Sequence, residues 1–306
     1  MSAAGAGQTP FVRAAVLMLL STLFFGLMAI TIRLASERIS TPEVAFFRNL
    51  FGLLAVLPLV MRMDPAALRT TQLSRYFVRC MVGIFSMLAG FWAIGHLPLA
   101  QAISLSYSSP VFVTILAAFM LNEKVHARRW SAVALGFVGV MVIVRPGSTD
   151  FSAGTLVALT AAILSGIVAI QIKQLSRVDA ANTIVLYTYL FWVPISLVPA
   201  LFVWEWPQGI AWAWVIGAGL FGTGGQVLWT HALKLGEVSA LTPISFVQLP
   251  LVALVGWIWF DETVDVWTWV GAGIILAANA YIAHREAVLL RRHATSAPVE
   301  AAKPGE

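Results

Sequence analysis

Apolar residues dominate this chain in long runs, and short polar or charged segments separate one run from the next. A helix needs about 20 mostly apolar residues to cross the hydrocarbon core of a bilayer. Ten runs of this kind, bounded by charged residues, glycine or proline, cover approximately residues 12–34, 43–62, 74–95, 98–121, 127–145, 154–176, 182–203, 209–232, 238–260 and 266–286. The pattern predicts an all-α integral membrane protein with ten transmembrane helices.

The composition agrees with lipid as the main solvent. Of the 306 residues, 59% are hydrophobic and only 11% are charged, whereas a soluble domain carries roughly 25% charged residues. The net charge of +5 does not indicate a nucleic-acid partner, because the basic residues are spread among the predicted loops. The single cysteine, Cys80, excludes an intramolecular disulfide and a thiolate metal cluster.

The placement of lysine and arginine predicts the orientation, since cytoplasmic loops are enriched in both. With a cytoplasmic N-terminus, 15 of the 19 basic residues lie on the cytoplasmic side, and these include Arg75 and Arg79 near the start of the third span. The opposite side of the membrane carries Arg33, Arg38 and Arg145, and Arg48 lies within a span. We therefore expect a multi-pass protein of the cell (inner) membrane with both termini in the cytoplasm.

The two halves of the chain resemble each other. The segment Gly26–Arg33 aligns with Gly166–Lys173 at a shift of 140 residues, and Pro110 and Pro250 keep the same shift. Each repeat holds five spans, an odd number, so the second copy must enter the membrane from the opposite side. Inverted repeats of this kind are typical of secondary transporters, whose sites lie near the midplane between the halves.

This organisation predicts the domain boundaries. Residues 1–11 form a cytoplasmic segment, residues 12–147 the first five-helix repeat, residues 148–286 the second repeat, and residues 287–306 a disordered cytoplasmic tail.

In their order and spacing, these features resemble the drug/metabolite transporter superfamily, specifically its EamA-type members with ten helices. The residues that carry the resemblance, besides the two repeats, are Pro42, Glu43, Arg48, Pro110, Glu123, Pro250 and Glu262. The resemblance covers nearly all of residues 12–286 and implies alternating access through a central cavity, without identifying a substrate. In the second repeat, Thr188 occupies the position that matches Arg48, so a pair of arginines is not predicted.

Polar side chains within the spans are the candidates for substrate contact. Gln101, Ser104 and Ser108 share one face of the fourth span, and the guanidinium of Arg48 has the geometry to bind a carboxylate or phosphate. The full set of expected substrate-binding residues is Arg48, Gln101, Ser104, Tyr107, Ser108, Gln226, Trp229, Thr230, Ser245 and Gln248. The alternative is that Ser, Thr and Gln hold helices together, and that Arg48 bonds helix-end carbonyls or reaches the interface.

Proline and glycine add two structural expectations. Pro110, Pro243 and Pro250 should break the fourth and ninth spans, because proline removes a backbone hydrogen bond. Small residues in the fifth and tenth spans, including Gly139, Gly271 and Gly273, should allow close helix packing.

No acidic residue lies deep in a span, which argues against a cation antiporter built on a buried carboxylate. Glu43 and His231 are the candidates for proton coupling, and a structural role at a helix end is the alternative for each.

The remaining sequence features favour a secondary transporter. The sequence contains no Walker A loop, no metal-ligand cluster and no hydrolase motif, so we expect no cofactor, no metal and no enzymatic activity. We predict export of an amino-acid-like or other small anionic or zwitterionic metabolite. Uptake of a nucleoside-like or vitamin-like solute is the alternative, and a membrane-embedded lipid-modifying enzyme is a distant one. The expected partners are the substrate, a coupling ion or proton, and the lipid bilayer, with the chain acting as a monomer or homodimer.

Overall fold

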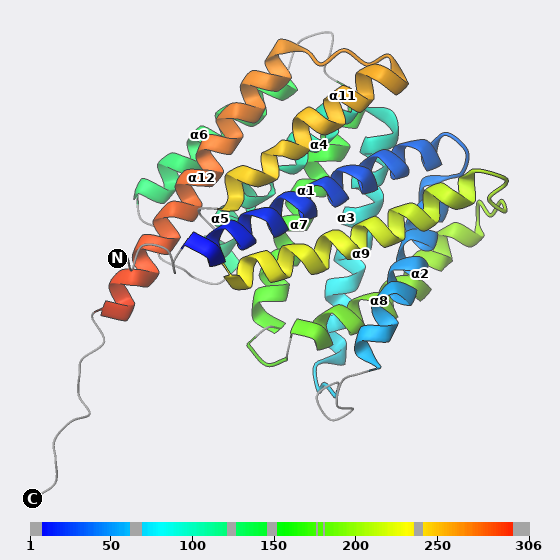
Figure 1. The fold of residues 1–306 in the computed structure, drawn as a ribbon, viewed down its shortest axis with the longest axis horizontal. Helices are drawn as coiled ribbons and strands as arrows, with labels where there is room; N and C mark the ends of the chain where they lie inside the picture. Colours follow the sequence, from blue (N-terminus) through cyan, green and yellow to red (C-terminus); the bar gives the residue numbers. More distant parts are fainter. Residues whose placement is uncertain are drawn as a thin grey trace, which may run out of the picture.

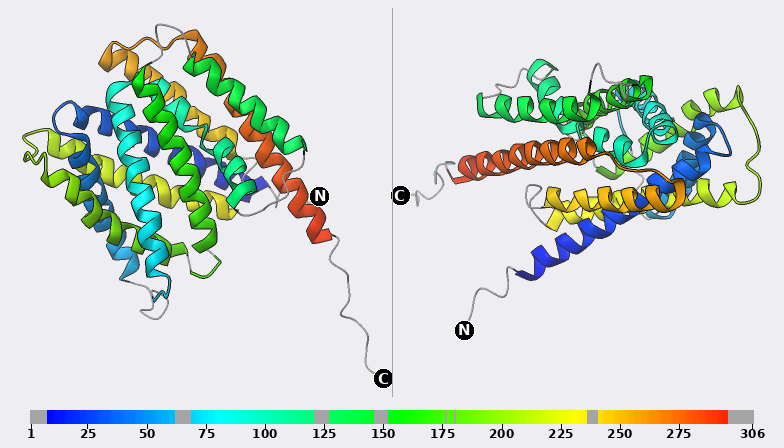
Figure 2. Two further views of the ribbon diagram at one scale, coloured as in Figure 1. Left: turned by 180° about the vertical axis from the view of Figure 1, so that it is seen from behind. Right: turned by 90° about the horizontal axis from the view of Figure 1, so that it is seen from above.

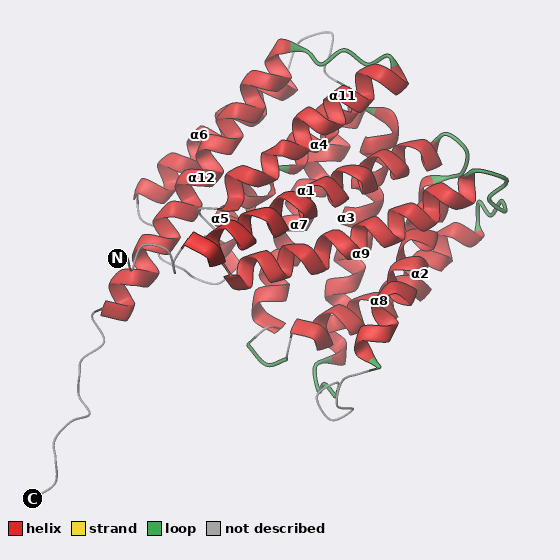
Figure 3. Ribbon diagram, in the orientation of Figure 1, coloured by secondary structure: helices red, strands yellow, loops and turns green. Residues whose placement is uncertain are grey.

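The computed structural model describes residues 8–61, 69–120, 127–145, 152–175, 177–179, 181–235 and 241–295, and all the regular structure in these residues is helical (Figures 1 and 3). The helices of the first repeat are α1 (Gln8–Ser36), α2 (Thr41–Val60), α3 (Leu73–His96), α4 (Leu99–Ser106), α5 (Ser109–Met120) and α6 (Ala127–Val144). Those of the second are α7 (Ala153–Leu175), α8 (Ala181–Leu201), α9 (Ala211–Leu235), η2 (Thr242–Val247), α11 (Gln248–Phe260) and α12 (Val266–Thr295). The all-α prediction is confirmed, and each expected span corresponds to one helix or to a broken pair.

The fourth and ninth spans are broken near their middles, as the prolines predict. Pro110 has no N–H to donate, and its ring crowds the carbonyl of the residue four positions earlier, which is Ser106, the last residue of α4. Pro250 likewise follows Phe246 by four positions, and Phe246 belongs to η2. This segment is a 3-10 helix, and α11 begins directly after it. Proline chemistry therefore places both breaks within the helix bundle.

The last helix is longer than the sequence analysis predicts. α12 continues to Thr295, so the predicted tail that starts at residue 287 begins inside a helix. The extension is rich in Ala, Leu and Arg, which favour helices, and basic residues near a helix C-terminus are stabilised by the helix dipole.

The two repeats pack as inverted equivalents. α1 packs along α9, and α3 packs along α7. Because α7 is the equivalent of α1 and α9 the equivalent of α3, the two contacts are the same pairing with the repeats exchanged. Figure 2 shows α3 and α7 side by side. Equivalent helices also pair directly, as α2 does with α8 and α6 with α12. We call the end of the bundle where α1 begins the proximal end, and the end where it finishes the distal end. Five spans per repeat place the start of α7 at the distal end, opposite the start of α1.

The largest apolar cluster lies toward the distal half of the bundle. The largest cluster of buried apolar side chains takes Ile32 from α1, Phe47 from α2, Ile94 from α3 and Ile275 from α12, all toward the distal ends of their helices. Smaller clusters hold the proximal half. The distal end of the bundle is therefore closed by packed side chains.

Glycines allow α6 and α12 to approach closely. A Cβ atom on Gly139 would lie 2.9 Å from the carbonyl oxygen of Gly271, and one on Gly271 would lie 2.6 Å from the carbonyl oxygen of Gly139. The predicted packing of these two helices is confirmed at both residues. At Gly273 a Cβ atom would meet nothing within 4 Å, so this glycine is not part of the contact.

Several helices are long and apolar enough to cross a membrane by themselves. Among the described residues, five stretches meet this criterion by length and composition: Val12–Ser36, Leu73–His96, Leu99–Leu116, Ala153–Ile172 and Thr183–Leu201. Three shorter apolar helices accompany them. Together with the mean hydropathy of +0.86, this supports a multi-pass integral membrane protein.

Candidate substrate site

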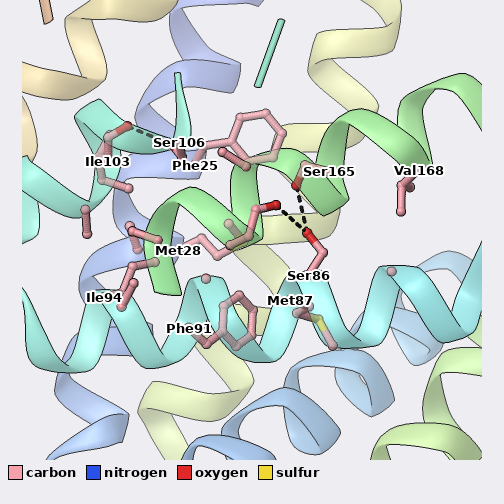
Figure 4. A pocket seen from close by; sticks show the side chains of 18 of the residues that line it. Phe25, Met28, Ser86, Met87, Phe91, Ile94, Ile103, Ser106, Ser165 and Val168 are labelled. Atoms are coloured by element: carbon pink, nitrogen blue, oxygen red, sulfur yellow. Dashed lines mark hydrogen bonds between the residues drawn. The ribbon is translucent and has the colours of Figure 1, made fainter. Parts of the chain in front are cut away.

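A cavity of about 460 Å³ lies between the two repeats, where α1, α3 and α4 face α7, α8 and α11 (Figure 4). Its walls are mostly apolar, and Phe25, Met28, Phe91 and Ile103 are among the lining side chains. Volumes of roughly 300–1,000 Å³ with apolar and aromatic walls are typical of small-molecule sites. Position and size therefore identify this cavity as the candidate substrate site.

Few polar groups reach the cavity, and hydroxyls predominate among them. The hydroxyl of Ser86 on α3 donates to the carbonyl oxygen of Ala161 at 2.9 Å and lies 2.8 Å from the hydroxyl of Ser165 on α7 (Figure 4). Ser106 and Gln248 complete the polar part of the wall. None of the described residues that line this cavity is charged. The pattern suits an uncharged, largely apolar molecule that carries some hydrogen-bonding groups.

α7 forms one side of the cavity, and none of the residues predicted for the site lies on this helix. Ala158, Ala162, Ser165 and Ala169 are spaced to lie on one face of this helix, and all four line the cavity. A stripe of small residues in the sixth span was the available signal. Small side chains on such a stripe usually indicate close packing between helices, and here they instead leave space.

The two broken helices meet beside the cavity. The hydroxyl of Tyr107, at the break between α4 and α5, donates to the carbonyl oxygen of Ser245 at 2.7 Å and lies 3.0 Å from Oε1 of Gln248. The amide of Asn279 on α12 donates to the carbonyl oxygen of Tyr107 at 2.7 Å. Of the predicted substrate-binding residues, Gln248 lines the cavity, while Tyr107 and Ser245 fix its position from behind.

The other substrate-binding residues predicted in the fourth span do not line the cavity. The hydroxyls of Ser104 and Ser108 are buried and donate to carbonyl oxygens of their own helical turn, at 2.7 Å from Ala100 and 2.6 Å from Leu105. Gln101 lines a separate pocket at the distal end. For Ser104 and Ser108 the contacts favour the alternative interpretation, that they stabilise helices.

The predicted residues of α9 also lie away from the cavity. Gln226 and Trp229 are on the exposed surface of the bundle, and Trp229 is 40% exposed. The side chains of Thr230 and Pro243 lie outside the described residues, as does Glu123. Pro110 and Pro250 are exposed, so their contribution is to break helices.

Arg48 has a neighbour that the sequence analysis did not anticipate. The guanidinium carbon of Arg48 lies 5.8 Å from the ring centre of Trp192, and that of Arg79 lies 5.6 Å from the same ring. Arg79 is 5% exposed and donates to the hydroxyl of Thr188, the residue that matches Arg48 in the second repeat. The position that matches Arg48 carries no arginine, as the sequence shows, and the second guanidinium near Trp192 comes from α3.

Neither candidate for proton coupling contacts the cavity. Glu43 is fully buried and accepts from the N–H and hydroxyl of Ser40, at 3.1 and 2.7 Å, and from the N–H of Glu205 at 2.7 Å. The bond from the Ser40 N–H is one half of a capping box at the start of α2, the half in which the glutamate accepts from the N-cap residue. His231 is exposed, with Nδ1 2.8 Å from the carbonyl oxygen of Val227. These contacts favour structural roles, and proton coupling by either residue stays a prediction.

An ion pair crosses between the repeats at the distal end. The guanidinium of Arg33 on α1 donates to Oε1 of Glu262 at 2.7 Å and to the carbonyl oxygen of Ile94 at 2.8 Å. Oε2 of Glu262 accepts from the N–H of Leu99 at 2.7 Å, so one carboxylate joins the α11–α12 loop to α1 and to the start of α4. Within the described residues, no group of three or more His, Cys, Asp or Glu could hold a metal ion.

Several known transporters are similar to this chain in sequence over most of its length. A riboflavin transporter of Vibrio cholerae is 31% identical over 280 residues, which cover 90% of this chain and 94% of that protein. An S-adenosylmethionine uptake transporter of Rickettsia prowazekii is 28% identical, covering 81% of this chain and 85% of that protein. A pseudopaline exporter of Pseudomonas aeruginosa is 27% identical, covering 86% and 93%.

A solved crystal structure supports the fold with a TM-score of 0.60 at 19% identity, covering 92% of this chain and 99% of that one. The model of the EamA-like transporter family matches residues 12–145 and 152–283, one copy for each repeat. The resemblance noted from the sequence is thereby confirmed, and with it a small-molecule transporter in place of an enzyme. The chain belongs to the EamA-like transporter family.

Proposed function

We propose that the protein takes up a flat, heteroaromatic, vitamin-like solute, with riboflavin as the first compound to test. The observation that carries this proposal is the central cavity, whose wall combines aromatic and apolar side chains with hydroxyls and one amide. Such a surface suits a ring system with a polar edge. The names of three relatives as riboflavin transporters, at 28–31% identity, support the same class of solute.

The charge of the cavity wall favours this solute over a free amino acid. A zwitterion in a low-dielectric site needs opposite charges or several hydrogen bonds around each ionised group. No described residue of the wall is charged. The wall therefore matches the alternative prediction of a vitamin-like solute better than the first prediction of an amino-acid-like one.

The distribution of charge and packing supports a direction of access. The distribution of basic residues favours a cytoplasmic proximal end. The large apolar cluster and the pair of Arg33 with Glu262 lie at the distal end. Ile172 is the last residue of α7 that lines the cavity. Its neighbour Gln171 lines a second pocket, which lies between the proximal ends of α3 and α7. We interpret this as the cytoplasm-facing state of an alternating-access cycle in the inner membrane.

Export of an amino-acid-like anion is a second candidate function. The pseudopaline exporter among the relatives supports it, as does the presence of Arg48 within a span. A transport assay that loads the solute on either side distinguishes export from uptake.

The proposed function is tested by counterflow in proteoliposomes. Vesicles preloaded with unlabelled riboflavin should accumulate labelled riboflavin, and Ala162→Leu should abolish the exchange because it fills the cavity from α7. Ile163→Leu is the matched control, since Ile163 is the next residue and is 38% exposed on the outer surface. Absence of riboflavin exchange by the folded wild-type protein would overturn riboflavin uptake. Unchanged exchange in a folded Ala162→Leu variant would show that the solute does not pass through this cavity.

A further inference from the structure

We propose that Arg48, Arg79 and Trp192 form a subsite for the carboxylate or phosphate group of an anionic solute, next to the central cavity. This inference rests on the proposed function, because it adds a charged group to the solute that the cavity holds. Neither the family match nor the names of the relatives assign such a subsite.

Three helices bring the three side chains together. α2 supplies Arg48, α3 supplies Arg79 and α8 supplies Trp192, and both guanidiniums approach the same indole ring. Each guanidinium is held through one end: Nη1 of Arg48 donates to Oδ1 of Asn49 at 3.0 Å, and Nη1 of Arg79 donates to the hydroxyl of Thr188. Both side chains are therefore positioned by the protein before a ligand arrives.

Three further polar atoms of the cluster are buried donors without acceptors. Nε of Arg48, Nε of Arg79 and Nε1 of Trp192 are all buried and have no hydrogen-bond partner. Arginine and tryptophan side chains have no acceptor atoms, so these groups cannot satisfy one another. Buried polar groups in proteins are nearly always paired. Three unpaired donors around one ring point to a ligand that supplies only acceptors, as a carboxylate or phosphate does.

The charge of the cluster leads to the same ligand class. In the part of the chain that the structure describes, no ion pair joins Arg48 or Arg79 to a carboxylate, whereas Arg33 and Arg145 each have one. Arginine does not lose its proton in proteins, so two like charges lie near one ring inside the bundle, Arg48 within its span and the buried Arg79 in the second turn of α3. Charges inside a membrane are costly and usually mark a substrate or ion pathway. An anion between the two guanidiniums would compensate both.

The subsite is next to the cavity. Arg79, Gly83, Ser86 and Gly90 are spaced to lie on one face of α3, and the last three line the cavity. Trp192 also lines the cavity, and its Nε1 lies only 3.1 Å from the position of a Cβ on Gly83. A solute in the cavity could therefore extend an anionic group past the edge of the indole ring.

A glycine of α9 packs against the guanidinium of Arg48. A Cβ on Gly222 of α9 would lie 3.1 Å from Nη2 and 3.3 Å from Nε of Arg48, and 2.7 Å from Sδ of Met28. Met28 lines the cavity, and its flexible side chain stands between the cavity and Arg48. Gly222→Ala should therefore cover the guanidinium and weaken anion binding while leaving its charge in place.

The test compares two probes that differ only in the anionic group, riboflavin and riboflavin 5′-phosphate. Their binding to the purified protein is followed by quenching of flavin fluorescence. We expect the wild type to bind the phosphate form at least tenfold more tightly. Arg79→Gln and Arg48→Gln should reduce this preference to less than threefold without changing the affinity for riboflavin, and Arg79→Lys should fall in between. Arg75→Gln is the matched control, because Arg75 is one turn earlier on α3 and exposed.

A second measurement separates this inference from the proposed function. Inorganic phosphate, titrated at constant ionic strength, should raise the unfolding temperature of the wild type and of Arg75→Gln but not of Arg79→Gln or Gly222→Ala. Phosphate stabilisation that depends on Arg79, without binding of either flavin, would retain the anion subsite and reject flavin uptake. Equal affinity for both flavins in the wild type, with no effect of phosphate on stability, would overturn the subsite.

Discussion

Glu262→Gln is expected to open the distal end of the bundle. The carboxylate of Glu262 is 2.7 Å from the guanidinium of Arg33 and 2.7 Å from the N–H of Leu99, and the side chains of Arg33 and Glu262 are only 16% and 12% exposed. Hydrogen bonds to charged groups contribute about 1.5–3 kcal/mol when buried, and exposed ion pairs about 0–1 kcal/mol. Allowing for the partial exposure, we expect a loss of about 2 kcal/mol from the distal-closed state.

That free energy corresponds to a large change in population. Since 1.4 kcal/mol is a factor of ten in an equilibrium constant, a loss of about 2 kcal/mol should increase the distal-open fraction about 30-fold. The assay is the labelling of Ala102→Cys in a Cys80→Ser background with a membrane-impermeant maleimide added from the distal side. Ala102 lines the cavity and is 5% exposed, so its labelling rate reports opening. The rate should rise about 30-fold in Glu262→Gln.

The matched control is Asp265→Asn. Asp265 pairs with Arg145 at the same distance of 2.7 Å and also joins the two repeats, but the side chains are 43% and 29% exposed. An exposed pair of this kind contributes about 1 kcal/mol or less, so labelling should rise less than about fivefold. An unchanged rate in a folded Glu262→Gln variant, or equal rates in the two variants, would refute this role for the ion pair.

Three further predictions concern the site, the packing and the caps. Gln248→Ala should raise the KM for riboflavin uptake about tenfold through loss of a hydrogen bond to the solute and of the contact with Tyr107, whereas Gln101→Ala should leave KM unchanged. Gly139→Val should destabilise the protein by about 1–3 kcal/mol through overpacking against α12, read as a lower unfolding temperature, and Gly273→Ala should not. Glu43→Gln should cost about 1–3 kcal/mol of stability, because the amide accepts through one atom only and leaves a buried donor without an acceptor. The pH profile of transport should not shift, and a shifted profile would support proton coupling by Glu43.

The candidate site could be predicted only in part from the sequence, because the signals used were helical position and polarity. Gln248 reaches the cavity as expected, but Ser104 and Ser108 turn their hydroxyls to their own backbone. A serine in a membrane helix can satisfy its hydroxyl within the same turn, and the sequence does not tell this from a cavity contact. The small residues of α7 have two possible roles that the sequence does not distinguish. Their spacing permits close packing when the facing helix is near, and it leaves a cavity when that helix is farther away.

The sequence by itself determined the solvent, the number of spans, the breaks and the inverted duplication. These follow from local properties: a run of apolar residues fits the thickness of a bilayer, proline removes a particular hydrogen bond, and an odd number of spans in each repeat inverts the second. The tertiary structure alone decided which helices enclose the cavity and that Arg79 joins Arg48 at Trp192. Those outcomes depend on how helices distant in sequence rotate and approach one another, and the side chains that decide this rotation belong to different helices.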